Sequence, residues 1–317
     1  MVARRVVVVY KSDNGDIGKA LVELQKQLKG CDIAAFIPRE KLVEKDTRNA
    51  VVIIAGGDGT LLGASHRILD DYSQVLGVRL KGESVGYYTA VDVENLARAM
   101  VELESSEEEE YEVHRLPRLE CIMHTDTGNW VRTDLALNEF FIANTCAYMP
   151  SKYTLLYQYP DGTRSGEYQR SSGVLVCTHH GYSGWVQWAR GGGKERAQYD
   201  FNSNVEIQNN SLCNVMNGKK RKYRPAQLPD VLRPETVLDK DQFFFHVREP
   251  IGAITLDDQR LGPTQKLLLQ SDMHRGFVVP DSFDEYHFNR GAEIEIRMSP
   301  KPLNIIHFDN KGKWRKD

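Results

Sequence analysis

The stretch GGDGT, residues 56–60, places an aspartate in the middle of a glycine turn. The continuous apolar run Val51–Ala55 precedes it, and Leu61–Leu69, whose apolar residues have helical spacing, follows it. A strand, a glycine turn and a helix start together form an anion site, because the first N–H groups of a helix lack backbone partners and the helix dipole favours negative charge there. Glycine also lets a phosphate group approach the backbone closely. The stretch therefore predicts a phosphate-binding loop.

Asp58 stands where phosphate-binding loops usually avoid negative charge. Beside a polyphosphate a carboxylate is repelled and takes up a proton more readily, which suits a general base for an attacking hydroxyl group or a carboxylate that orients Mg²⁺. An aspartate that only stabilises its own turn is the structural alternative. The loop lacks the lysine of the G-x-x-x-x-G-K-[ST] motif, so backbone dipoles and a metal ion would have to stabilise the charge. We predict phosphoryl transfer with Asp58 as the catalytic residue and with phosphate contacts from the rest of the loop: Gly56, Gly57, Gly59 and Thr60.

Strand-like and helix-like segments alternate over the first hundred residues. Short apolar strands separated by helical crossovers favour a doubly wound parallel sheet of the Rossmann type. The expected strands are Val6–Tyr10, Ala34–Ile37, Val51–Ala55 and Gln74–Val78, and the expected helices are Ile17–Leu28, Leu61–Leu69 and Glu94–Glu104.

The chain changes character after the acidic run Glu107–Glu110, which we interpret as a solvated helix end or linker. Segments rich in β-formers follow, and near the C-terminal end apolar and charged residues alternate as in a half-buried strand. This pattern predicts an antiparallel β domain. A polar stretch over residues 191–242, with the basic run Lys219–Arg224, is expected to be a solvated loop, with a phosphate-contacting arm as the alternative. The expected strands are Arg118–Thr125, Val131–Leu137, Tyr153–Gln158 and Ala292–Met298.

Composition excludes several classes of protein. The net charge is −3, with 41% hydrophobic and 27% charged residues, so no global basic field indicates nucleic-acid binding. No apolar run reaches the ~18 residues that a membrane span needs. Five scattered cysteines are typical of unpaired thiols in a reducing compartment, and the N-terminal run lacks the pattern of a secretion signal. We expect a cytoplasmic protein that binds neither nucleic acid nor a membrane.

The chain resembles the NAD kinase family in several motifs. The GGDGT loop followed by leucines is shared with that family, with diacylglycerol and sphingosine kinases and, more loosely, with phosphofructokinases. Other stretches bring the chain nearer to NAD kinases, and the resemblance in order and spacing covers most of the chain, being weakest between Gly191 and Gln242. These stretches are GVRLKGESVGYYTAV (Gly77–Val91), DLALNEFFI (Asp134–Ile142), SSGVLVCTHHGYSGW (Ser171–Trp185), GAITLDDQRLG and GAEIEIRMSPKPLNIIHF.

The resemblance implies a fold and a reaction. The fold would be an α/β domain over residues 1–110, a β-rich, sandwich-like substrate domain over 111–300, and a tail over 301–317 that returns to the first domain. The reaction would transfer the γ-phosphate of ATP, with Mg²⁺, to the 2′-hydroxyl of the adenosine ribose of NAD. The family also implies a homo-oligomer. No protein ligands for a metal are implied. The implied substrate-binding residues are Asn138, Glu139, Thr178, His180, Tyr182 and Ser183.

One loop departs from the family pattern. NAD kinases usually have Thr-Pro-Thr-Gly-Ser-Thr-Ala-Tyr where this chain has THHGYSGW, residues 178–185, which we name the Thr178–Trp185 loop. The departure leaves two alternatives open: a related kinase with another hydroxyl acceptor (a nucleoside, a sugar alcohol or a lipid), and a non-catalytic nucleotide-binding homologue. Some of the implied substrate-binding residues also have a purely structural interpretation. Asn138 and Glu139 could form a polar turn at a strand end, and Thr178 could be a plain strand residue.

Overall fold

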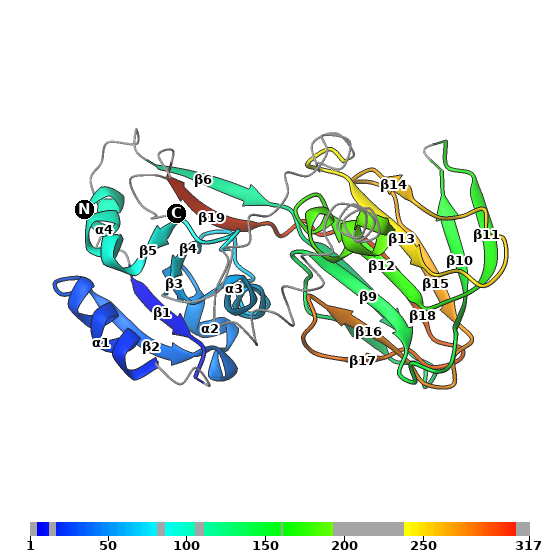
Figure 1. The fold of residues 1–317 in the computed structure, drawn as a ribbon, viewed down its shortest axis with the longest axis horizontal. Helices are drawn as coiled ribbons and strands as arrows, with labels where there is room; N and C mark the ends of the chain where they lie inside the picture. Colours follow the sequence, from blue (N-terminus) through cyan, green and yellow to red (C-terminus); the bar gives the residue numbers. More distant parts are fainter. Residues whose placement is uncertain are drawn as a thin grey trace, which may run out of the picture. The chain divides into compact units, whose positions relative to one another are not determined.

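The computed structural model describes residues 5–12, 17–80, 86–104, 111–159, 161–192 and 238–308 (Figure 1). The runs Glu107–Glu110 and Lys219–Arg224 lie outside the described residues. The chain divides into two compact units. Unit 1 comprises Met1–Glu120, Asp134–Leu137 and Ser299–Asp317, and unit 2 comprises Cys121–Thr133 and Asn138–Met298. None of the described helices combines the length and the apolar character that crossing a membrane requires.

Unit 1 contains a seven-stranded sheet with the order β2-β1-β3-β4-β19-β6, in which β5 also pairs with β4. Strands β1 to β5 pair in parallel, as the alternation of short apolar strands and helices predicts. Strand β3 is buried at every residue, which is typical of a central strand covered on both faces. The strands are β1 (Val6–Tyr10), β2 (Ile33–Pro38), β3 (Val51–Ala55), β4 (Gln74–Arg79), β5 (Val91–Asp92), β6 (Tyr111–Leu116) and β19 (Leu303–Phe308).

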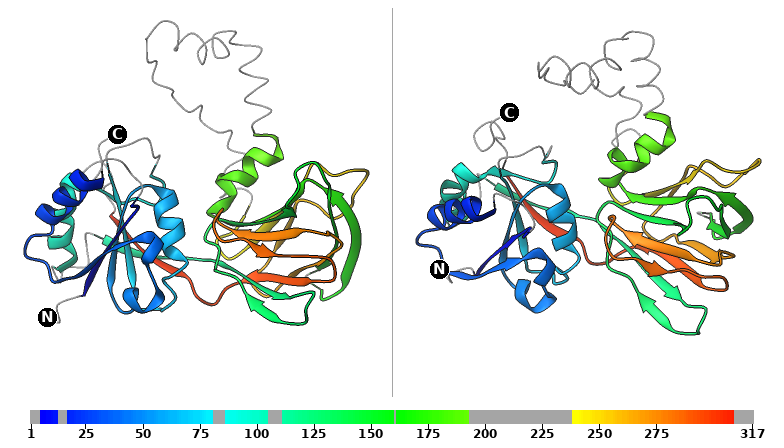
Figure 2. Two further views of the ribbon diagram at one scale, coloured as in Figure 1. Left: turned by 90° about the horizontal axis from the view of Figure 1, so that it is seen from below. Right: turned by 60° about the horizontal axis from the view of Figure 1, so that its bottom comes forward.

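Helices cover both faces of this sheet (Figure 2). One face packs Val8 and Ile53 against α1 and α4, and the other packs Val9 and Ile54 against α3. The Rossmann-like α/β prediction is therefore confirmed. The helical elements of unit 1 are α1 (Ile17–Gln27), η1 (Arg39–Lys41), α2 (Glu44–Thr47), α3 (Asp58–Ser65), η2 (Val93–Asn95) and α4 (Leu96–Glu104).

The C-terminal segment returns to the first sheet, as predicted. Strand β19 lies between β4, with which it is parallel, and β6, with which it is antiparallel (Figure 1). Four of its six residues form an unbroken buried run, so the tail is part of the core of unit 1.

Arg118 fixes the end of helix α3 to the start of this tail. Its side chain is fully buried. Its guanidinium group donates to the carbonyl groups of Ser65 and Ile68 at 3.0 and 2.9 Å, and to those of Lys301 and Pro302 at 2.9 and 3.3 Å. The first two lie at the C-terminal end of α3 or just beyond it, where carbonyl groups lack helical partners and the helix dipole favours a cation. One buried cation thus holds the helix that begins at the GGDGT loop.

Unit 2 is a sandwich-like pair of six-stranded sheets, with the orders β11-β10-β15-β18-β7-β8 and β14-β13-β12-β9-β16-β17 (Figure 2). The strand pairings are antiparallel, and the alternating burial along β10 is that of a strand with one face in the core. The predicted β-rich, sandwich-like class is confirmed. The strands include β7 (Leu119–His124), β8 (Trp130–Arg132), β9 (Glu139–Asn144), β10 (Ser151–Gln158), β11 (Arg164–Ser171), β12 (Gly173–Thr178), β13 (Phe243–Arg248), β14 (Gln259–Leu261), β15 (Leu267–Ser271), β16 (Gly276–Pro280), β17 (Tyr286–His287) and β18 (Glu293–Met298).

The predicted strand over residues 131–137 is wrong in its extent. Strand β8 covers only Trp130–Arg132, and Asp134–Leu137 belongs to unit 1, where Ala136 forms a bridge with Leu119. The β-forming residues of this stretch are therefore divided between two units, and periodicity alone does not show where a chain passes from one to the other.

Short helical turns cover the outer face of the second sheet of unit 2. They are η3 (Gly181–Ser183), α5 (Trp185–Gln187) and the π-helical turn η4 (Trp188–Gly192). Tyr182 and Val186 pack there against Leu175, Cys177 and Phe244 of the sheet. The Thr178–Trp185 loop is thus held on β12 and β13 by an apolar cluster.

Replacing Arg118 should destabilise unit 1. We expect Arg118→Ala to lower the free energy of unfolding by about 3 kcal/mol or more, because it leaves several buried carbonyl groups without a donor. Arg118→Lys should recover only part of the loss, since an ammonium group cannot reproduce the spread of the guanidinium donors. Urea unfolding of the full chain measures both. The exposed Arg115 of β6 is the matched control, and Arg115→Ala should change stability by about 0.5 kcal/mol at most. Equal effects at both positions would contradict the role of Arg118.

Candidate functional site

The GGDGT loop is a tight turn between β3 and α3. Gly57 is the N-cap residue of α3, and Asp58 is its first residue. Gly56 has a φ of +158°, and a Cβ atom there would lie 2.5 Å from Oγ1 of Thr60. Any side chain at position 56 would therefore collide with Thr60, whose own side chain is buried. Gly59 is exposed and has open space at its Cα atom. The loop thus has the geometry of a phosphate-binding helix start.

Both carboxylate oxygens of Asp58 accept backbone hydrogen bonds. The N–H group of Tyr87 donates to Oδ2 at 2.9 Å, and that of Tyr88 donates to Oδ1 at 2.8 Å. Asp58 therefore holds a segment beyond β4, rather than only its own turn. Each carboxylate oxygen has a second lone pair, so the group can still accept a hydroxyl proton or face a cation.

Arg39 was missed by the sequence analysis as a neighbour of this loop. It lies in η1, after β2, and its Nη1 donates to the carbonyl group of Gly59 at 3.3 Å. Its Nη2 lies 3.1 Å from the carboxylate of Glu40, and its side chain is 17% exposed. A guanidinium group therefore lies beside a loop that has no lysine of its own. The sequence offered no local signal, because β1, β2 and β3 become neighbours only in the sheet.

In unit 2 the structure brings together two motifs that are distant in the sequence. The N–H group of Thr178 donates to the carbonyl group of Asn138 at 2.9 Å, and Cys177 pairs with Glu139 across β12 and β9. A Cβ atom at Gly181 would lie 2.1 Å from the carbonyl oxygen of Asn138, so only glycine allows the Thr178–Trp185 loop to lie this close. The Asn-Glu motif and this loop therefore form one candidate substrate site.

Glu139 is a buried carboxyl group with unusual proton affinity. It is 7% exposed, and among the described residues its carboxyl group has no hydrogen-bond partner. Burial, together with the negative charge of Asp281, raises the pKa of Glu139 to about 8. At neutral pH this group is largely a neutral acid, which can donate a hydrogen bond as well as accept one. It is available to a ligand with both donor and acceptor atoms.

Asp281 was also missed by the sequence analysis. Its Oδ1 accepts from the N–H groups of Asn138 and Glu139 at 2.7 and 3.1 Å, and its φ of 48° is left-handed. The aspartate after the proline that ends β16 indicates a turn, but nothing in the sequence shows that this turn meets β9.

The other predicted substrate residues differ in their exposure. Thr178 is fully buried, and its Oγ1 accepts from the N–H group of Gly181 at 3.1 Å. Tyr182 is fully buried in the apolar cluster beneath the loop, while His180 and Ser183 are half-buried, and the Ser183 hydroxyl donates to the carbonyl of His180 at 3.2 Å. His180 and Ser183 can therefore meet a ligand directly, and Thr178 and Tyr182 support the loop from within.

Comparisons with known proteins agree with this architecture. No family model matches the chain. An NAD kinase of Staphylococcus aureus (strain JH9) is 31% identical over 99 residues, which cover 31% of this chain and 36% of the relative, so the match spans about a third of the length of the curated relatives.

Two solved structures share the fold over 98% of this chain. One is an NAD kinase from Archaeoglobus fulgidus in complex with ATP, with a TM-score of 0.62, 19% identity and 96% of that chain covered. The other is yeast NADH kinase complexed with NADH, with a TM-score of 0.69, 14% identity and 85% of that chain covered.

The fold and the GGDGT loop define a chain of the same structural class as these nucleotide-binding proteins. The local sequence match and the fold point to the same family: over 99 residues the sequence is similar to an NAD kinase, and the fold of the chain is the fold of the two kinase structures.

Glu139 should make stability depend on pH. An unfolded glutamate loses its proton near its ordinary pKa of 4.5, whereas the folded protein keeps this proton up to about pH 8. The folded state therefore binds more protons between these values, and the contribution of Glu139 to stability falls as the pH rises through this window. We therefore compare the free energy of unfolding of Glu139→Gln with that of the wild type. The difference should shift in favour of the variant by a few kcal/mol between pH 5 and pH 9.

Urea unfolding of both full-length proteins at pH 5, 7 and 9 measures this gap. Other titrating groups cancel in the difference between the two proteins. Glu285→Gln, at an exposed position of the same unit, is the control and should show a gap that is independent of pH. A constant gap for Glu139→Gln as well would show that Glu139 is ionised in the folded protein throughout this range.

Proposed function

We propose that this protein is an NAD kinase, which transfers the γ-phosphoryl group of ATP to the 2′-hydroxyl of the adenosine ribose of NAD and forms NADP. The observation that best supports the proposal is the GGDGT loop, folded as a phosphate site with a carboxylate at the start of α3, in a chain with the NAD kinase fold. The relatives named above are kinases of NAD or NADH, and structures of such kinases hold ATP or NADH.

In this proposal unit 1 binds phosphates and receives the proton. The N–H groups at the start of α3 hold phosphate oxygens, and Asp58 accepts the proton of the acceptor hydroxyl as its oxygen attacks phosphorus. Arg39 adds positive charge beside Gly59. Mg²⁺, arriving with ATP, would fit beside the carboxylate of Asp58, because this ion is usually held by one or two carboxylates and by substrate phosphates. It would neutralise the charge of the phosphate groups.

Unit 2 binds the adenosine part of NAD. Adenosine has both donor and acceptor atoms, and the neutral carboxyl group of Glu139 together with the amide of Asn138 matches both kinds. His180 and Ser183 line the exposed side of the loop and contact the rest of the substrate.

A second acceptor remains a candidate because of the Thr178–Trp185 loop. Its two histidines, tyrosine and tryptophan replace smaller residues of the family pattern, and that is the part of the chain expected to contact the acceptor. The test incubates the protein with ATP, Mg²⁺ and NAD, and detects NADP with a dehydrogenase that accepts only NADP. ADP release with a nucleoside, sugar alcohol or lipid but not with NAD would overturn the acceptor assignment. NAD binding in calorimetry without any ADP release would indicate a non-catalytic homologue.

Asp58→Asn should abolish most of the turnover. We expect kcat to fall by about 10²–10⁴, the range for loss of general acid–base catalysis. The KM for ATP should change little, because the backbone donors of the loop remain. Calorimetric titration with NAD checks that the variant still binds. Wild-type turnover in a folded Asp58→Asn protein would refute the catalytic role.

Arg39→Ala should weaken ATP binding. Loss of a charged donor beside the loop is expected to raise the KM for ATP about tenfold, the size of one charge-assisted hydrogen bond. The KM for NAD should stay within a factor of two. Arg48→Ala is the matched control, since Arg48 pairs with Glu44 on the exposed surface of α2. Steady-state kinetics of the wild type, Arg39→Ala and Arg48→Ala measures these KM values. An unchanged KM for ATP in Arg39→Ala would show that Arg39 does not contribute to ATP binding.

A further inference from the structure

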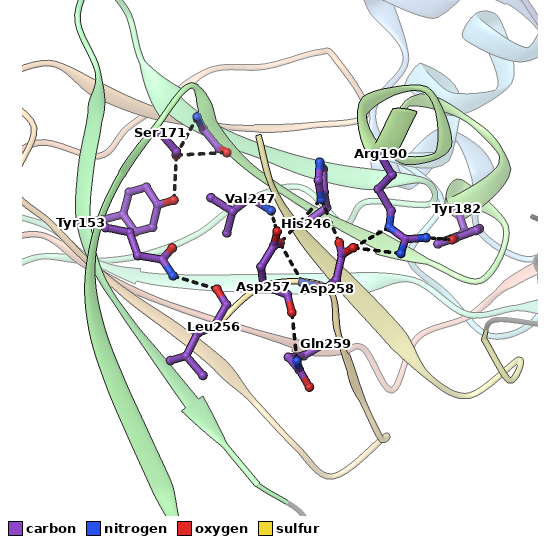
Figure 3. Close-up of polar contacts among 12 residues, drawn as sticks. Tyr153, Ser171, Tyr182, Arg190, His246, Val247, Leu256, Asp257, Asp258 and Gln259 are labelled. Atoms are coloured by element: carbon purple, nitrogen blue, oxygen red, sulfur yellow. Dashed lines mark hydrogen bonds and ion pairs between the residues drawn. The ribbon is translucent and has the colours of Figure 1, made fainter. Parts of the chain in front are cut away.

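Tyr182 of the Thr178–Trp185 loop belongs to a network of polar and charged side chains within unit 2 (Figure 3). Its members are Tyr182 of η3, Arg190 of η4, His246 of β13, and Asp257 and Asp258 in the turn before β14. Tyr182 stands where the family pattern has a smaller serine, and Asp257 and Asp258 lie in the stretch GAITLDDQRLG, for whose side chains the proposed function gives no role.

Arg190 joins the loop to this network. Its Nε and Nη2 both lie 2.9 Å from Oδ2 of Asp258, and its Nη1 donates to the hydroxyl group of Tyr182 (Figure 3). Its guanidinium group also lies over the rings of Phe244 and Tyr182, 5.1 and 5.8 Å from their centroids. Arg190 is carried by a π-helical turn, a rare element that is often found at functional sites.

Asp258 is held in place by groups on its other side. Its φ of 52° is unusual for an aspartate, and its Oδ1 accepts from Nδ1 of His246 at 2.9 Å. Asp257 accepts from the N–H groups of Val247 and Asp258, both at 2.7 Å, and lies 3.6 Å from His246. These contacts fix the strained backbone from which Asp258 reaches Arg190.

The network is balanced in charge, which argues against a metal site. Burial alone would lower the pKa of His246, but Asp257 and Asp258 raise it to about 9. Burial also opposes ionisation of Asp258, but His246 and Arg190 hold the pKa of Asp258 below its ordinary value. At neutral pH two cations therefore face two carboxylates. The atoms of His246, Asp257 and Asp258 are close enough to hold a metal ion, but the ion would have to displace a bound proton and Arg190.

We infer that Arg190 and Asp258 are positioning residues, which hold the Thr178–Trp185 loop against Asn138 through the side chain of Tyr182. Tyr182 directly follows Gly181, whose backbone touches the carbonyl group of Asn138. Holding the side chain of Tyr182 in place therefore also holds the contact that assembles the candidate substrate site of unit 2. The inference rests on the proposed function, because it assigns the pair to NAD binding rather than to phosphate transfer.

The test uses the full chain and two conservative variants, Tyr182→Phe, which removes one hydroxyl group, and Arg190→Lys, which removes the paired donors. We expect each variant to raise the KM for NAD about tenfold, while kcat and the KM for ATP stay within a factor of two. Amide hydrogen exchange in residues 178–188 should become about tenfold faster in both variants. Arg260→Lys, at an exposed position of β14 two residues from Asp258, should change neither quantity.

The two readouts separate this inference from the proposed function. If the wild type forms no NADP, the proposed function fails, and faster exchange in the variants would still support the positioning of the loop. If the wild type forms NADP and both variants match it in the KM for NAD and in exchange, the inference is wrong. A loss of kcat with an unchanged KM for NAD would overturn it as well, because the pair would then act on the chemical step.

Discussion

The backbone contact between Gly181 and Asn138 is the constraint on which the candidate substrate site of unit 2 depends. Two segments far apart in the sequence meet there so closely that a Cβ atom would lie 2.1 Å from a carbonyl oxygen. Once this contact forms, Thr178 donates to the same carbonyl group, and Glu139 lies beside Cys177 under the loop. The identity of the other loop residues is less constrained, because the contact uses the backbone.

The candidate phosphate loop of unit 1 likewise depends on a close contact that only glycine allows. A Cβ atom at Gly56 would collide with Thr60, so the turn is fixed by a close approach rather than by a salt bridge. The donors that face a ligand are backbone N–H groups at the start of α3, and the other end of α3 is held by the buried guanidinium of Arg118. A rigid helix with a cation behind it presents its N-terminal dipole in a fixed direction. Both candidate binding regions therefore rest on glycine contacts supported by buried polar groups.

The sequence predicted the parts of the fold that are locally encoded. The apolar runs Val6–Tyr10 and Val51–Ala55 form the expected parallel strands, and the alternation near the C-terminus forms β18. The strand–turn–helix around Asp58 also follows from local pattern. Arg39, Asp281 and Arg190 could not be found in this way, since each reaches a motif through a sheet or a loop from elsewhere in the chain. The early end of β8 was missed for a related reason, because the chain passes from one unit to the other between Thr133 and Asp134, within a stretch that contains β-forming residues on both sides.

The charged groups around His246 and the carboxyl group of Glu139 differ in their contacts, and the difference indicates what each region of unit 2 does. Around His246 every charge has a partner, and such a closed network gives rigidity but has little left to offer a ligand. Glu139 is buried without a hydrogen-bond partner among the described residues, beside a second carboxylate, and this arrangement costs folding free energy. A substrate that hydrogen-bonds to Glu139 would recover that free energy on binding. The closed network is therefore suited to hold the loop, and the buried carboxyl group of Glu139 is suited to recognise a ligand.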